Sequence, residues 1–253
     1  PLLDAMGIRN EILSQDEEDF RRQLDEAVRY MTETGEAFAL IVRKNTFEPY
    51  SLQRNEVNEY PLSREEAIQT VASSLGPKDV IVSTTGMISR ELFEYRAAKG
   101  QGHERDFLTV GSMGHASQIA LGIALERADR KVWCFDGDGA ALMHLGSMAI
   151  VADKAPANFV HVVFNNGAHD SVGGQPTVGL KVSLTGIAKA VGYKEAVLAT
   201  TAEELAAALN RLNEYDGPVL LEVRVHRGNR KDLGRPTTTP VQNRDALMSF
   251  LNK

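Results

Sequence analysis

The sequence has 253 residues, of which 43% are apolar and 25% charged, a balance typical of a globular protein with one large domain, or one domain and part of another. The net charge of −6 argues against a nucleic-acid-binding surface, and no apolar run is long enough to span a membrane. The single cysteine, Cys134, excludes an intrachain disulfide and favours a cytoplasmic location.

The predicted elements begin with an amphipathic helix over residues 16–35 and a strand over 37–42. One helix–strand unit is too small to fold alone, so we interpret residues 1–42 as the end of a preceding domain. Residues 43–62 are polar and irregular and contain two prolines, a composition typical of a linker. The main domain is therefore expected from residue 63 onward.

From residue 63 to the end, short apolar strands alternate with helical segments. Several strands are apolar throughout, which is typical of parallel strands covered on both faces. Two helices begin with a capping-box pattern, Ser63 with Glu66 and Thr201 with Glu204. The alternation predicts an α/β fold with a doubly wound parallel sheet flanked by helices. The expected strands are 79–84, 106–110, 131–137, 159–166, 195–200 and 218–225, and the expected helices are 63–75, 87–99, 114–128, 140–153, 183–191, 201–214 and 241–252.

Small polar residues follow two of these strands where they end. Gly137-Asp138-Gly139 closes one strand, and Asn165-Asn166-Gly167 closes the next. Ligands of an open α/β sheet bind beyond the carboxyl ends of its strands, and glycines before a helix suit a phosphate. The carboxylate of Asp138 would repel a phosphate unless a hard cation lay between them, and Mg²⁺ prefers such oxygen ligands. A dinucleotide fingerprint is weakened by Leu142, which stands where a third glycine is required.

The two motifs together resemble the signature of thiamine-diphosphate enzymes, in which Gly-Asp-Gly is followed by Asn-Asn. In this sequence 25 residues separate Gly139 from Asn165. The resemblance implies a thiamine-diphosphate-binding fold, with thiamine diphosphate and Mg²⁺ as cofactors. It assigns the metal to Asp138, Asn166 and the backbone carbonyl of Ala168, and it adds Gly137, Gly139 and Ala140 as cofactor contacts.

The segment 109–125 resembles a second cofactor-binding motif of the decarboxylases in this family. In that motif a Gly-x-(Ile/Met/Leu)-Gly sequence lies between a strand and a helix, and the letters GSMG match it. The resemblance implies that the Gly111 carbonyl accepts a hydrogen bond from the cofactor's 4′-amino group and that Met113 bends the cofactor. His115 and His169 follow the two cofactor segments and are candidates for substrate contact or proton transfer, although each could be an ordinary polar loop residue.

Four stretches resemble more narrowly the phosphonopyruvate and sulfopyruvate decarboxylases of this family. The resemblance implies non-oxidative decarboxylation of a 3-substituted 2-oxo acid, either phosphonopyruvate to phosphonoacetaldehyde and CO₂ or, as a β-type subunit, sulfopyruvate. It also implies that residues 1–42 end a pyrimidine-binding domain and that 63–253 form the diphosphate-binding domain. The stretches are STTGMISRELFEYR (83–96), VGSMGHAS (110–117), FNNGAHDSVGGQPT (164–177) and DLGRPTTTP (232–240).

One feature of the family is unmatched in this sequence. The family uses a glutamate near the start of the pyrimidine-binding domain to activate the cofactor's aminopyrimidine, and the acidic residues within 1–42 do not match it. The resemblance therefore implies that an upstream segment or a separate subunit supplies this glutamate, within a homo- or hetero-oligomer. The alternative is a cofactor-binding fragment without activity of its own; a carboligase would need a middle domain, for which the sequence has no room.

Three cationic side chains are candidates for binding the anionic tail of the substrate: Arg90, Lys231 and Arg235. Arg90 lies in the first turn of a predicted helix and could instead cap it. Lys231 and Arg235 belong to a basic cluster over 227–236, which could equally be a solvated face.

Overall fold

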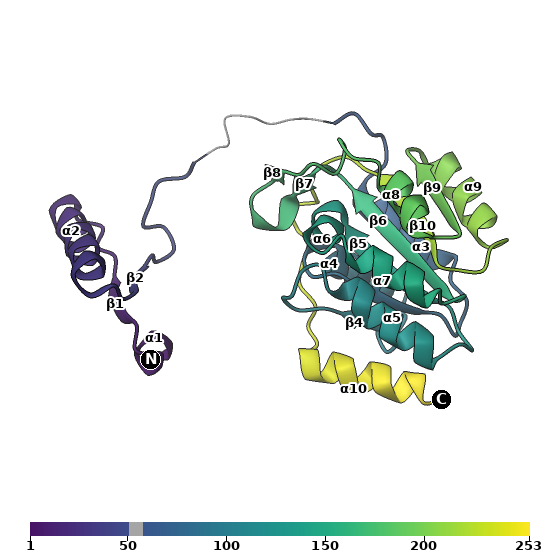
Figure 1. Cartoon of the computed structure of the whole chain (residues 1–253), viewed down its shortest axis with the longest axis horizontal. Coiled ribbons are helices and arrows are strands. Elements are labelled where there is room, and N and C mark those ends of the chain that lie inside the picture. The colour runs from purple at the N-terminus through teal and green to yellow at the C-terminus, as the bar shows by residue number, and fades with distance from the viewer. Residues whose placement is uncertain (51–57) are drawn as a thin grey trace. The chain divides into compact units, whose positions relative to one another are not determined.

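The computed structural model describes the whole chain except residues 51–57, and its elements are labelled in Figure 1. The chain divides into two compact units, residues 1–55 and 56–253. The boundary between the units falls within the predicted linker, 43–62, of which 51–57 lies outside the described residues. That the first unit ends a pyrimidine-binding domain stays a prediction.

In its described residues, 1–50, the first unit contains two helices and a two-stranded parallel sheet. Helix α2 (Glu17–Thr34) and strand β2 (Phe38–Ile41) confirm the predicted helix and strand. Asp16 caps α2, because its carboxylate accepts hydrogen bonds from first-turn N–H groups. The sequence does not predict helix α1 (Leu2–Ala5) or strand β1 (Arg9–Ile12). Strand β1 has a single apolar residue, and only its pairing with β2 makes it a strand.

The second unit is built on a six-stranded sheet in which every neighbouring pair is parallel. The strand order is β4-β3-β5-β6-β10-β9, so the direction of winding reverses between β3 and β5. This confirms the predicted doubly wound sheet and puts the ligand-binding crevice of such folds at the ends of β3 and β5. The strands are β3 (Val80–Ser83), β4 (Asp106–Leu108), β5 (Val132–Gly137), β6 (Phe159–Asn165), β9 (Glu195–Ala199) and β10 (Val219–Arg224).

Helices cover both faces of this sheet (Figure 1). Apolar side chains of α3, α4 and α9 pack on one face, and those of α5, α7, α8 and α10 pack on the other. Strands covered on both sides need apolar residues throughout, which explains the unbroken apolar runs. Within the described part of the chain, no helix combines the length and the apolarity needed to cross a membrane. The helices named here are α3 (Arg64–Ser73), α4 (Met87–Ala98), α5 (Ala116–Glu126), α7 (Ser147–Lys154), α8 (Leu184–Val191), α9 (Ala202–Leu212) and α10 (Pro240–Leu251).

The predicted helix over 140–153 is wrong as a single element. Two helices occupy this region, α6 (Asp138–Met143) and α7, because the backbone of His144 leaves the helical region and Gly146 precedes the second helix. Helix α6 therefore begins inside the Gly-Asp-Gly motif rather than after it. The carboxylate of Asp138 consequently lies at the first residue of the helix, beside its free N–H groups.

The two predicted capping boxes have different outcomes. Ser63 and Glu66 form a complete box at the start of α3. Thr201 accepts a hydrogen bond from the backbone N–H of Glu204, as expected. The Glu204 carboxylate, however, accepts its hydrogen bonds from Thr200, one residue earlier, so the second box is incomplete.

Candidate active site

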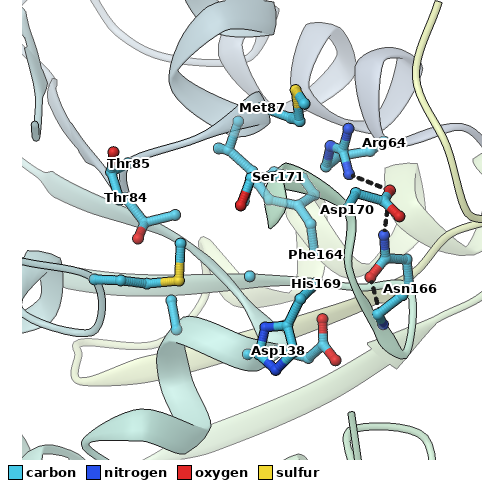
Figure 2. A pocket seen from close by; sticks show the side chains of 16 residues that line it. Arg64, Thr84, Thr85, Met87, Asp138, Phe164, Asn166, His169, Asp170 and Ser171 are labelled. Carbon is cyan, nitrogen blue, oxygen red and sulfur yellow. Dashed lines mark hydrogen bonds and ion pairs between the residues drawn. The ribbon is translucent and has the colours of Figure 1, made fainter. Parts of the chain in front are cut away.

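A cavity lies beyond the ends of β3, β5 and β6, where the winding of the sheet reverses (Figure 2). Thr84 and Thr85 lie on one side of it, and Asn166 lies on the opposite side. Most of the predicted cofactor and metal residues come together here. Those that line the cavity are Met113, Gly137, Asp138, Gly139, Ala140, Asn166, Ala168 and His169.

Asp138 is a buried carboxylate, only 2% exposed. The Thr177 hydroxyl donates a hydrogen bond to it, and so does the backbone N–H of Gly139. Burial nevertheless raises the pKa of the Asp138 carboxyl, because the charge is removed from water. Among the described residues, no lysine or arginine forms an ion pair with it. A buried carboxylate that no lysine or arginine neutralises fits a divalent cation.

Asn166 is held in one orientation. Its Nδ2 donates a hydrogen bond to Asp170 at 2.7 Å, which assigns the other side-chain atom as oxygen. That Oδ1 accepts a hydrogen bond from the Ala168 N–H at 2.9 Å and still has a second lone pair. The preceding Asn165 is fully buried and instead donates to Gly179 and Glu222. Of the two asparagines, Asn166 is therefore the one whose oxygen suits a metal.

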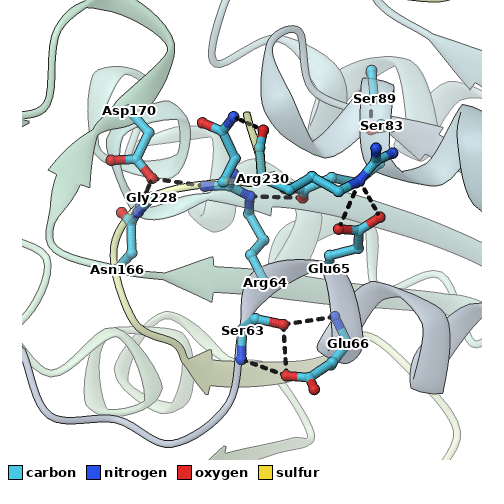
Figure 3. Close-up of polar contacts among 12 residues, drawn as sticks. Ser63, Arg64, Glu65, Glu66, Ser83, Ser89, Asn166, Asp170, Gly228 and Arg230 are labelled. Atoms are coloured by element: carbon cyan, nitrogen blue, oxygen red, sulfur yellow. Dashed lines mark hydrogen bonds and ion pairs between the residues drawn. The ribbon is translucent and has the colours of Figure 1, made fainter. Parts of the chain in front are cut away.

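A charged network holds the partner of Asn166 in place (Figure 3). Asp170 accepts hydrogen bonds from Arg64 at 3.0 Å and from the Gly228 N–H at 2.9 Å. Arg64 also makes two bonds of 2.8 Å to Glu91, and both side chains are buried. Burial alone would lower the pKa of Arg64, but Glu91 and Asp170 raise it above its ordinary value. The guanidinium therefore stays charged and joins helices α3 and α4 to the candidate metal ligand.

A short hairpin packs directly on the first turn of α6. It consists of β7 (Ala168–His169) and β8 (Gln175–Pro176), which flank a 3₁₀ turn. A Cβ atom on Gly139 would lie 2.5 Å from the ring of His169, and one on Gly179 would lie 2.4 Å from the Asp138 carboxylate. The backbone approaches closely at both positions because side chains are missing there.

The sequence reasoning overlooked Thr84 as a site residue. Its hydroxyl is buried, lines the cavity and has no hydrogen-bond partner in the described part of the chain. An unpaired buried hydroxyl is costly, so a ligand with acceptor oxygens suits it. The sequence does indicate such a role for Thr84, because Thr84-Thr85 follows strand β3 in the same way that the Asp and Asn motifs follow their strands.

Five of the predicted site residues do not line this cavity. His115 is exposed, its Nδ1 is 3.1 Å from the Ser112 carbonyl and its ring contacts His144. Gly111 is also exposed and has a positive φ of 71°. Arg90 and Arg235 line a neighbouring cavity, and the exposed Lys231 lines neither cavity. The roles of His115 and His169 stay predictions.

The family of the chain follows from a match to a known protein family. Residues 84–223, more than half of the chain, match the family described as thiamine pyrophosphate enzyme, C-terminal TPP binding domain. The chain belongs to the thiamine-diphosphate enzymes. The matched region begins directly after β3 and contains the ends of β5 and β6, so it includes Thr84 and the Asp138 and Asn166 motifs that line the cavity. Thiamine diphosphate is the cofactor of this family, which typically also uses a divalent metal such as Mg²⁺.

Curated relatives and solved structures agree with this family. The chain is 39% identical to a phosphonopyruvate decarboxylase of Streptomyces viridochromogenes over 75% of this chain and 46% of that protein. It is 37% identical to sulfopyruvate decarboxylase subunit beta of Methanocaldococcus jannaschii over 64% of this chain and 83% of that subunit. Benzoylformate decarboxylase from Polynucleobacter necessarius shares the fold, with a TM-score of 0.56, 16% identity, and 90% of this chain and 45% of that chain covered.

The chain spans about half the length of the phosphonopyruvate decarboxylases that it matches. By contrast, it covers most of the sulfopyruvate decarboxylase beta subunit. Among these relatives, the phosphonopyruvate decarboxylases are about twice as long as the matched region, whereas the sulfopyruvate decarboxylase beta subunit is a separate chain only slightly longer than it.

Proposed function

We propose that the chain is the diphosphate-binding part of a decarboxylase that uses thiamine diphosphate and Mg²⁺. Its substrate is a 3-substituted 2-oxo acid, with phosphonopyruvate as the first candidate and phosphonoacetaldehyde and CO₂ as the products. The observation that carries the proposal is the meeting of Asp138, Asn166 and Met113 in one cavity where the sheet winding reverses. Identities of 39% and 40% to two phosphonopyruvate decarboxylases support the choice of substrate.

Different residues of the cavity would bind different parts of the cofactor and its metal. Asp138, Asn166 and the Ala168 carbonyl would hold the metal, and the first-turn N–H groups of α6 beside Asp138 would face the diphosphate. Thr84 offers its unpaired hydroxyl as a donor. When bound, the cofactor supplies the electron sink that makes loss of CO₂ possible. The chain itself binds, orients and shields the reacting groups.

Met113→Ala is expected to slow turnover more than it weakens cofactor binding. The thioether lines the cavity, and removing it leaves the cofactor without the apolar surface that fixes its bent shape. Misplacement of this kind costs about 10–100-fold in kcat, whereas the diphosphate contacts are untouched. Steady-state kinetics and titration calorimetry on the complete enzyme separate the two effects. Met248→Ala, on an exposed methionine of α10, is the control. An unchanged kcat for Met113→Ala would refute the role.

Turnover is expected to require a pyrimidine-binding domain with an activating glutamate, in the same polypeptide or in another subunit. The resemblance to a beta subunit supports the second arrangement. The test measures CO₂ release from phosphonopyruvate by this chain alone and after addition of a pyrimidine-binding domain. We expect nearly no activity in the first case and restored activity in the second. Full activity of the chain alone would show that one of its own acidic residues activates the cofactor.

Substrate choice tests the proposed function directly. A phosphonate is close to a dianion at neutral pH, and a pocket that binds it must offer cations or several N–H donors. Pyruvate leaves such donors unpaired, at ~1–3 kcal/mol for each buried group. We expect the complete enzyme to prefer phosphonopyruvate over pyruvate by at least about 100-fold in kcat/KM. A clear preference for sulfopyruvate, the second candidate, would transfer the assignment to the sulfopyruvate decarboxylases, as the similarity to their beta subunit allows.

A further inference from the structure

A second cavity, of about 210 Å³, adjoins the first, and Thr85 lines both. It lies beyond the end of β4, at the start of α4 and beside the segment that leads into α10. Its volume is below the ~300–1,000 Å³ of pockets for drug-sized ligands, so it suits a small group. Two of the three candidate cations for the substrate, Arg90 and Arg235, line this cavity.

Arg90 and Arg235 differ from the other arginines of the second unit in their lack of partners. Among the described residues from 63 to 253, every other arginine side chain donates a hydrogen bond or forms an ion pair. No such contact is found for the Arg90 and Arg235 side chains in that part of the chain. No described residue that lines the cavity is acidic. Two unpaired guanidinium groups therefore give the cavity a positive potential that the protein leaves unbalanced.

The start of α4 adds backbone donors to the same cavity. Its N-cap is Gly86, which provides no side-chain cap, and Gly86 lines the cavity. The hydroxyl of Ser89 donates to the Thr84 carbonyl and contacts Ser83, so it does not cap the helix either. Uncapped first-turn N–H groups and the helix dipole favour an anion at this position. The helix start and the two arginines thus point to the same kind of ligand.

We propose that this cavity receives the anionic tail of the substrate, a tetrahedral phosphonate or sulfonate. This inference rests on the proposed function, because the substrate's ketone would then lie in the first cavity and its tail in the second. Thr85, which lines both cavities, marks the passage between them. Arg90 and Arg235 pair with the oxygens of the tail, a geometry that guanidinium groups favour. A methyl group in the same place leaves both arginines unpaired.

The kinetic test compares three acids on the complete enzyme. We expect Arg90→Gln and Arg235→Gln each to lower the ratio of kcat/KM for phosphonopyruvate to that for pyruvate by at least about tenfold, since each removes a charge-assisted donor. Arg244→Gln is the matched control, because it removes an exposed guanidinium from α10 outside the cavity, and it should leave the ratio unchanged. Equal ratios in wild type and both arginine variants, or an equal loss in the control, would overturn the proposal. If kcat/KM in the arginine variants falls more for one of phosphonopyruvate and sulfopyruvate than for the other, that acid carries the tail that the cavity binds.

A binding measurement distinguishes failure of this proposal from failure of the proposed function. Methylphosphonate and methylsulfonate are titrated into the complete enzyme and into the Arg90→Gln/Arg235→Gln variant, whose folding is checked by circular dichroism. We expect at least one anion to bind to the wild type and to bind at least about tenfold more weakly to the variant. If this holds while no 2-oxo acid is decarboxylated, the proposed function is wrong and the anion site stands. If the wild type decarboxylates a 2-oxo acid but binds neither anion, the anion site is wrong. It is also wrong if the wild type and the variant bind both anions with the same affinity.

Discussion

Asp138→Asn is expected to abolish Mg²⁺-dependent binding of thiamine diphosphate. The substitution keeps the size of the side chain but removes the one charged group among the proposed metal ligands. Losing an outer-shell partner of a metal site typically costs 10–100-fold in affinity, so loss of the charged ligand itself should cost at least about 100-fold. Titration calorimetry of the cofactor, with Mg²⁺ and with a chelator, measures the effect. Wild-type affinity in the variant would contradict the metal assignment.

The same variant separates binding from folding. Asp138 is buried, burial raises the pKa of its carboxyl, and no described lysine or arginine pairs with it, so its charge stabilises the metal-free protein little or not at all. We therefore expect the free energy of unfolding, measured without metal, to be no lower in Asp138→Asn than in the wild type. Asp153→Asn is the matched control, because the Asp153 side chain is 70% exposed and is not a proposed metal or cofactor ligand. It should change neither cofactor affinity nor stability.

Arg64→Met is expected to lower the free energy of unfolding by ~3–5 kcal/mol. The variant leaves the buried Glu91 and the half-buried Asp170 as neighbouring carboxylates without their shared cation. Cofactor affinity should fall as well, because Asp170 then no longer holds Asn166 firmly. Chemical denaturation at pH 7 measures the first effect, and calorimetry measures the second. The control is Arg244→Met, whose ion pair with Asp245 is exposed and should contribute less than ~1 kcal/mol.

The stability loss of Arg64→Met should depend on pH in a defined direction. Burial already raises the pKa of Glu91 in the folded protein, and without Arg64 nothing opposes that effect. A carboxyl whose folded pKa lies above its unfolded value of ~4.3 weakens folding above that pKa and not below the unfolded value. The deficit relative to wild type should therefore shrink as the pH falls from 7 to 4. A deficit that stays constant over this range would contradict the explanation by buried unpaired charge.

Those features that depend on strand ends could be predicted from the sequence. The apolar runs predict the strands of the second unit, and the residues that follow them come to one edge of a parallel sheet. Asp138, Asn166 and Ala168 meet in the cavity for this reason. Met113 reaches the same cavity from the loop after β4, as the resemblance of that loop implies.

Features that depend on contacts between distant segments could not be predicted. Arg64 sits beside the capping residue Ser63 in a charged stretch, where an arginine is expected to face solvent. Its partner Asp170 is 106 residues away, and only the packing of α3 against the sheet brings the two together. His115 and His169 illustrate the same limit, because both follow a cofactor motif but only His169 lines the cavity.

The strand order also governs when the sheet can close during synthesis. β10 is the last strand to be made, yet it lies between β6 and β9. A nascent chain that ends before residue 219 therefore leaves β6 with one open edge and β9 with no neighbour. All seven residues of β6 are buried in the finished protein, so the open edge would present unpaired backbone groups on a largely apolar strand and would be prone to pair with other chains. The hydrogen bond from Asn165 to Glu222 can form only once β10 is in place, so we expect the loop that carries the proposed metal ligand Asn166 to become ordered late.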